Sequence, residues 1–231
     1  MTKRLVLLAV AGTSLLALTG CAQSGNVAAH VGDATVRTSD VDFLSRMQCD
    51  TLDKAAADPA QAAQGGAQMV ATSRIRTTMV NTLIQAELNR QLAAKDDLSY
   101  DTTTLRNVMA QFESVVKEVP TADQARFRDL VRDIYRGQLQ VYTKAQSDLA
   151  SQGVEEPTQD QVDKTIAAIQ AKYRKSVGVD VNPVYGADAD GVAGAADSSL
   201  SRAVSPFAKK ASSAQQDPVW VSKLPAGQRC G

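Results

Sequence analysis

The chain has few of the residues from which catalytic and metal sites are usually built. Among its 231 residues there is one histidine, His30, and none of the three cysteines belongs to a CxxC pair. His30 has no arrangement of serine, cysteine or carboxylate residues around it in the sequence with which it could form a catalytic site. We therefore expect neither an enzyme nor a bound cofactor. Basic and acidic residues number 25 each. A nucleic-acid partner would require a basic face, and the balance argues against one.

A metal site is not predicted either, because the cysteines lie far apart and have no clustered histidine beside them. The segment GADADG at 186–191 shares some of the spacing of a calcium loop. A loop that starts at Gly186 has no carboxylate at its first position, and its twelfth residue is Asp197 instead of the bidentate glutamate. We therefore interpret this segment as a solvated turn.

The sequence begins with an apolar run, at 5–18, that is too short to span a bilayer, which takes about 20 residues. Lys3 and Arg4 precede this run. The run ends in the sequence Leu-Thr-Gly-Cys, at 18–21. This order is typical of a secretory signal, and its end resembles the bacterial lipobox, in which the cysteine thiol is acylated. We predict a signal peptide at 1–20 and a lipid on Cys21 that anchors the protein to the outer face of the cell membrane, outside the cytoplasm. The alternative is an ordinary secretory signal that contains a cysteine.

Two cysteines remain, Cys49 and Cys230, and they would lie in an oxidising compartment. An even pair in an exported chain predicts a disulfide. Two free thiols are the alternative.

The N-terminal part of the mature chain has the pattern of a β-hairpin. Apolar residues alternate over 27–31 and 34–37, and Gly32-Asp33 between them is a turn signal. A two-stranded hairpin alone is marginal, so we expect the β-prone segment 179–183 to lie beside it. Thr38-Ser39 then predicts the N-cap of a first helix.

Helical spacing of apolar residues predicts the rest of the fold, which we expect to be mainly α with this small β element. A loop or frayed helix end at 53–68 precedes a strong helix at 68–94. Helices from Asp101 or Thr102 to Pro120 and from Thr121 to Ser151 suggest an antiparallel helical hairpin, an extended arm. The last clear helix ends at Gly178. Capping-box patterns begin at Thr121 and at Thr158.

Composition then divides the chain into segments. Residues 21–26 form a short tether, and 27–186 form one multi-helix domain. Residues 187–217 are rich in Ala, Ser, Asp and Gly, which is typical of a flexible low-complexity segment. Residues 218–231 contain Trp220 and Cys230, so we expect this tail to be docked on the body.

Several motifs in this order resemble a known family. They are VAAHVGD at 27–33, SDVD at 39–42, Leu83-Ile84 with Glu87-Leu88, and NPVYG at 182–186. The pattern is similar to the N-terminal domain of the SurA and trigger-factor group of chaperones, and NPVYG looks like the NPRYG ending of SurA-like lipoproteins from high-GC Gram-positive bacteria. Val184 departs from it, where arginine is expected. The chain also has no segment that resembles the parvulin isomerase domain of many relatives.

The resemblance implies a chaperone-like binder of unfolded or partly folded exported proteins, without isomerase activity. Candidate client-binding residues lie on the two arm helices: Met109, Phe112, Phe127, Ile134 and Tyr135. A lipid-anchored scaffold or assembly subunit that binds one folded envelope partner is the alternative. An exposed apolar groove between arm and body would favour the chaperone, and a flat polar arm would favour the scaffold.

Overall fold

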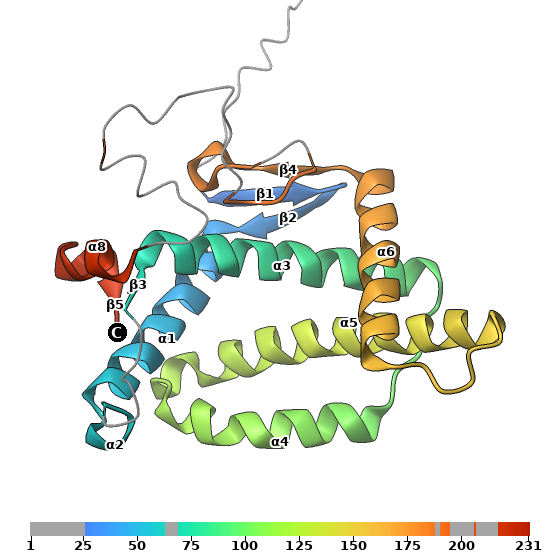
Figure 1. Ribbon diagram of the computed structural model, residues 1–231, viewed down its shortest axis with the longest axis horizontal. Coiled ribbons are helices and arrows are strands. Elements are labelled where there is room, and N and C mark those ends of the chain that lie inside the picture. Colours follow the sequence, from blue (N-terminus) through green and yellow to red (C-terminus); the bar gives the residue numbers. More distant parts are fainter. Residues whose placement is uncertain (1–25, 63–68, 188–189, 195–205, 207–216) are drawn as a thin grey trace, which may run out of the picture.

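A computed structural model describes residues 26–62, 69–187, 190–194, 206 and 217–231. The chain is mainly α-helical with a small antiparallel β element, which confirms the predicted fold class (Figure 1). The predicted signal peptide, the tether residues before Asn26, Cys21 and most of the 187–217 segment lie outside the described residues.

Six helices form most of the structure, and three strands form a sheet. The helices are α1 (Thr38–Ala57), α2 (Pro59–Ala62), α3 (Thr72–Lys95), α4 (Thr102–Glu118), α5 (Gln124–Ser151) and α6 (Gln159–Val177). The strands are β1 (Val27–Val31), β2 (Ala34–Arg37) and β4 (Val179–Val181). A second sheet consists of β3 (Val70–Ala71) and β5 (Arg229–Cys230), and the short elements are η1 (Thr121–Asp123), η2 (Pro183–Tyr185), α8 (Pro218–Ser222) and η3 (Ala226–Gln228).

The main sheet has the strand order β2-β1-β4, and both pairings are antiparallel. The expected hairpin is present, and the C-terminal segment joins its β1 edge as predicted, although the strand is shorter. It ends at Val181 because Asn182 and Pro183 turn the chain into η2. Asn182 still extends the pairing, since its backbone N–H donates to the Ala28 carbonyl at 2.9 Å.

Two of the four predicted helix caps are wrong, while Asp101 is confirmed as the cap of α4, where its side chain accepts from the Thr103 and Thr104 N–H groups. Thr38 and Ser39 lie inside α1, whose N-cap position is Arg37. Thr121 does not cap α5, because the chain first forms the 3-10 turn η1, closed by the Asp123 N–H on the Pro120 carbonyl at 2.8 Å. The capping box at Thr158 is confirmed, with both reciprocal hydrogen bonds to Gln161 present.

Helix α3 lies at the centre of the molecule, between the main sheet and the α4–α5 hairpin (Figure 1). Its most deeply buried stripe is Val80, Ile84 and Leu88, which are at most 1% exposed. These side chains belong to one core cluster with residues of β1, α1 and α5.

The α4–α5 hairpin is present, but it does not stand away from the body as an extended arm. Helix α5 packs against α3 and α6 as well as α4. The reason is that the buried face of α5, which includes Val131, Gly137 and Val141, packs on more of the molecule than α4 alone. Only its C-terminal part leaves the main core, and there Ala145 and Leu149 form a small cluster with Val162 of α6.

Glu87 connects α3 to the main sheet through a neighbouring amide. Its carboxylate accepts hydrogen bonds from Arg90 at 2.6 and 2.8 Å and from Gln91 at 2.7 Å, and Gln91 also donates to the Val31 carbonyl at 2.9 Å. Burial raises the pKa of Glu87, but the hydrogen bonds from Arg90 and Gln91 outweigh it and hold the pKa below its ordinary value.

This lowered pKa predicts a pH-dependent contribution to stability. A carboxyl whose pKa is lower in the folded state stabilises the protein above its unfolded-state pKa, and the effect is lost as the pH falls through the folded value. The Glu87→Gln variant should therefore be less stable than the parent at pH 7. We expect the difference to shrink as the pH falls below the ordinary pKa range of a glutamate carboxyl, as measured by urea unfolding at a series of pH values. A difference that stays constant over this range would contradict the assignment.

Candidate functional site

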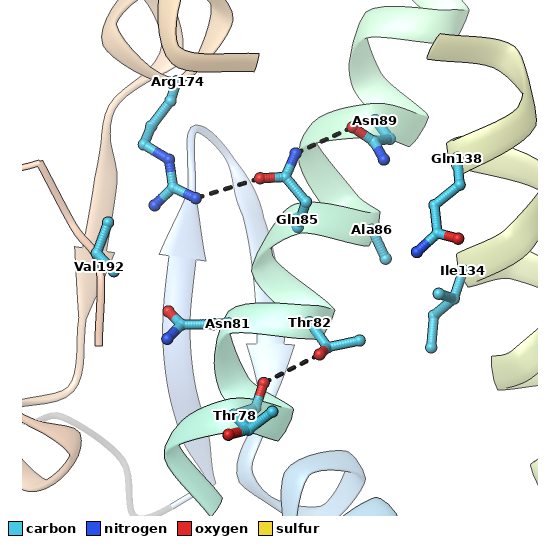
Figure 2. A pocket seen from close by; sticks show the side chains of 10 residues that line it. All are labelled: Thr78, Asn81, Thr82, Gln85, Ala86, Asn89, Ile134, Gln138, Arg174 and Val192. Atoms are coloured by element: carbon cyan, nitrogen blue, oxygen red, sulfur yellow. Dashed lines mark hydrogen bonds between the residues drawn. The ribbon is translucent and has the colours of Figure 1, made fainter. Parts of the chain in front are cut away.

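A polar pocket of about 440 Å³ lies between α3, α5 and α6, beside the segment at 190–194 (Figure 2). One face of α3 supplies most of its wall. The lining residues are Thr78, Asn81, Thr82, Gln85, Ala86, Asn89, Ile134, Gln138, Arg174 and Val192. None of them is a histidine, cysteine or carboxylate, so the pocket offers hydrogen-bonding groups and some apolar surface but no acid, base or thiol.

A chain of hydrogen bonds fixes the orientation of the amides in this pocket. The Arg174 guanidinium, which can only donate, donates to Gln85 Oε1 at 3.4 Å. Gln85 Nε2 must then donate in turn, and it reaches Asn89 Oδ1 at 3.0 Å (Figure 2). Gln170 Nε2 donates to the same Asn89 oxygen at 3.1 Å.

This chain leaves Asn89 Nδ2 as a donor without a partner in the described part of the protein. Asn89 is only 1% exposed. A buried donor that lacks an acceptor costs about 1–3 kcal/mol. The pocket is therefore suited to a group that brings an acceptor oxygen to Asn89, such as a carbonyl; a water molecule can serve in its absence.

Side chains of α3 and α6 help to hold the short wall of the pocket at 190–194. Asn81 pairs with Ala193 like a neighbouring strand residue: its side chain donates to the Ala193 carbonyl and accepts from the Ala193 N–H, both at 2.9 Å. Arg174 donates to the Gly191 carbonyl at 2.9 Å. The guanidinium thus both supports the wall and begins the amide chain.

Gly137 lets α5 come close to α3 beside the pocket. A Cβ atom at this position would lie 3.0 Å from the Asn89 Cβ, a tighter contact than packed side chains normally make. The absence of a side chain on Gly137 therefore allows Ile134 and Gln138, one turn before it and one residue after it, to form the opposite wall.

The structure does not bring the predicted client-binding residues together as an exposed apolar groove. Phe127 is a core residue, only 7% exposed, so its side chain is packed inside the protein and does not lie on the surface. The rings of Phe112 and Tyr135 pack on each other, with centroids 5.3 Å apart. They and Met109 are half-buried where α4 lies along α5. Of the five, only Ile134 lines the polar pocket.

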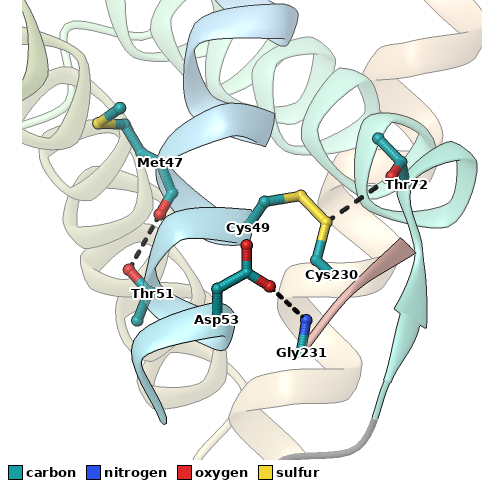
Figure 3. The surroundings of a disulfide bond; sticks show 7 residues. All are labelled: Met47, Cys49, Thr51, Asp53, Thr72, Cys230 and Gly231. Carbon is teal, nitrogen blue, oxygen red and sulfur yellow. Dashed lines mark hydrogen bonds between the residues drawn. A yellow bond between two sulfur atoms is a disulfide. The ribbon is translucent and has the colours of Figure 1, made fainter. Parts of the chain in front are cut away.

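Cys49 of α1 and Cys230 of β5 form a disulfide, with their Cα atoms 5.1 Å apart (Figure 3). The C-terminal tail is docked around it. The Gly231 N–H donates to Asp53 at 2.6 Å, and Val221 and Leu224 are buried against Ala71. The bridge therefore ties the tail to the first helix.

Other candidate features stay apart from the pocket. His30 is exposed on β1, and its Nδ1 lies 3.4 Å from the Thr35 hydroxyl. Within the described ranges, no three His, Cys, Asp or Glu side chains come together as a metal site. None of the helices that the structure describes has the length and apolar character needed to cross a membrane.

Comparison of the chain with known protein families, curated proteins and solved structures found no match. The class that the structure defines is a mainly α protein with a small antiparallel sheet and a polar pocket on its central helix.

Proposed function

We propose that the protein is a membrane-anchored extracytoplasmic lipoprotein that binds unfolded or partly folded exported proteins, without isomerase activity. The observation that carries this proposal is the unpaired Asn89 amide in a pocket lined mostly by neutral amides and hydroxyls, with the Arg174 guanidinium on one wall. A main-chain carbonyl is an acceptor that every unfolded polypeptide carries, whatever its sequence. The resemblance of the sequence to SurA-type chaperones, and the lipobox-like segment that ends at Cys21, support the same proposal.

This mode of binding would be broad and weak. The pocket would form hydrogen bonds with the backbone of a client, so it would have little preference for particular side chains. Ordering a flexible chain costs about 2–5 kcal/mol or more of the gross interaction energy. We therefore expect micromolar affinity at best.

One observation favours the alternative, a scaffold that binds a single folded envelope partner. The outer face of α4 is polar and exposed, and the apolar residues of the hairpin are largely used in packing. The exposed residues include Arg106, Asn107, Ala110, Gln111 and Ser114. An exposed polar face of this kind suits a folded partner better than an unfolded chain.

Light scattering of a denatured client protein diluted into buffer separates the two proposals. The purified protein should suppress aggregation at several-fold molar excess, and it should not accelerate isomerisation of a proline peptide. No protection, together with tight binding to one folded partner, would favour the scaffold. Measurable isomerase activity would contradict our interpretation that the chain lacks a parvulin domain.

A further inference from the structure

A second pocket, of about 270 Å³, lies between α1 and the first turns of α3, next to the disulfide. Four of its lining residues are spaced at i, i+3, i+4 and i+7 on α1, so they share one helix face. The lining residues are Asp42, Ser45, Arg46, Cys49, Thr72 and Arg76.

Two hydrogen-bond donors of this pocket are buried without a partner among the described residues. Ser45 is 4% exposed, and its hydroxyl makes no hydrogen bond. The Nε of Arg76 is likewise buried and unpartnered. Another nitrogen of the same guanidinium pairs with Asp42 at 2.7 Å, so Arg76 is held in place while its Nε remains available.

The start of α3 adds positive potential beside these donors. Its N-cap residue, Ala71, has no side chain that can accept from the first-turn N–H groups, and the first turn contains no acidic residue. The N-terminus of a long helix attracts negative charge through its first-turn N–H groups and the helix dipole.

Arg46 and Arg76 place two guanidinium groups at the pocket. Each has a carboxylate partner: Arg76 pairs with Asp42 at 2.7 Å, and Arg46 lies 3.9 Å from Asp123, outside the lining. The Arg46 side chain is 57% exposed, and its guanidinium also lies 5.6 Å from the centre of the Phe43 ring.

We propose that this pocket binds a small oxyanion of the phosphate class. The oxygens of a phosphate group can accept hydrogen bonds from both the Ser45 hydroxyl and Arg76 Nε. A tetrahedral group also presents oxygens in several directions, which fits donors that come from α1 and from α3. The source is either free phosphate or the phosphodiester of a phospholipid headgroup, which a membrane-anchored protein would meet. This site is separate from the polar pocket, and its test does not depend on client binding.

Isothermal titration of the purified protein tests the site, with inorganic phosphate as one probe and dihexanoyl-phosphatidylglycerol below its micellar concentration as the other. Hydrogen bonds to charged groups contribute about 1.5–3 kcal/mol, so Arg76→Gln should weaken binding by about tenfold or more. Ser45→Ala should weaken it by about threefold or more. Arg132→Gln removes a charge on the outer side of α5, where Arg132 pairs with Asp129, and should change nothing.

The two probes distinguish the sources, because tighter binding of the lipid assigns the site to a headgroup and tighter binding of phosphate assigns it to the free ion. The proposal is overturned if neither probe binds, or if Arg132→Gln weakens binding as much as Arg76→Gln does. Circular dichroism checks the fold of each variant. Ser45→Ala removes only a hydroxyl, so it keeps the test decisive even if Arg76→Gln does not fold.

Discussion

Replacement of both Cys49 and Cys230 by alanine should lower the free energy of unfolding by about 5 kcal/mol, which is an upper figure. The bridge joins residues 181 positions apart. A cross-link over so long a loop removes much of the conformational freedom of the unfolded chain, and in the chain-entropy model the effect grows slowly with loop length. The loss should also loosen the tail, because the two-residue pairing of β3 with β5 is too short to hold it alone.

Urea unfolding of the oxidised parent and of the double variant measures this difference. A reductant should destabilise the parent and leave the variant unchanged, which controls for other effects of the reagent. Intact mass after alkylation, with and without prior reduction, tests the bridge itself. Alkylation of both Cys49 and Cys230 in the unreduced folded protein would show that the bridge is absent.

Truncation of Ile84 to alanine should be the next most damaging change, at about 2–5 kcal/mol. Ile84 is fully buried on α3, between the main sheet and the helical hairpin. Removal of its outer carbons takes apolar contact from both sides and leaves a cavity that the surrounding elements cannot fill without moving.

Met79 provides a matched control on the same helix. Its side chain is only half-buried at the edge of the core. The Met79→Ala variant should therefore lose clearly less stability than Ile84→Ala in the same urea titration. Equal losses, or a larger loss at Met79, would contradict the assignment of Val80, Ile84 and Leu88 as the most deeply buried stripe of α3.

The elements that could be predicted from the sequence are those whose signals are local. The alternation at 27–37, the β-prone segment after Gly178 and the Thr158–Gln161 capping box each lie within a few residues. The pairing of β3 with β5 could not be predicted in this way. Each strand has two residues, which is too few to show an alternating pattern, and the partners come from opposite ends of the chain.

The polar pocket was missed for a different reason. Thr78, Thr82, Gln85 and Asn89 form a polar stripe on α3 that can be recognised afterwards by its helical spacing. A polar stripe ordinarily faces solvent, and only the fold brings Arg174 across it. Apolar spacing was equally ambiguous on α5, because it shows that Phe127 lies on an apolar face but not whether that face is packed or free.

The central claim is that the Asn89 amide donates to the backbone of an unfolded client. Asn89→Asp replaces the donor nitrogen with an oxygen and keeps the size and shape of the side chain. Asn107→Asp makes the same change on the exposed face of α4. Thr82→Met places a larger side chain in the pocket and leaves Asn89 unchanged. It provides a second test if the Asn89→Asp variant does not fold.

Fluorescence anisotropy of a labelled unfolded client, titrated with each protein, is the most direct measurement of this claim. Loss of a hydrogen bond and an added repulsion between oxygens should raise the dissociation constant of Asn89→Asp by about tenfold or more. Thr82→Met should also weaken binding, and Asn107→Asp should match the parent. The claim is contradicted if the parent does not bind the client, or if folded Asn89→Asp and Thr82→Met proteins bind it as tightly as the parent does.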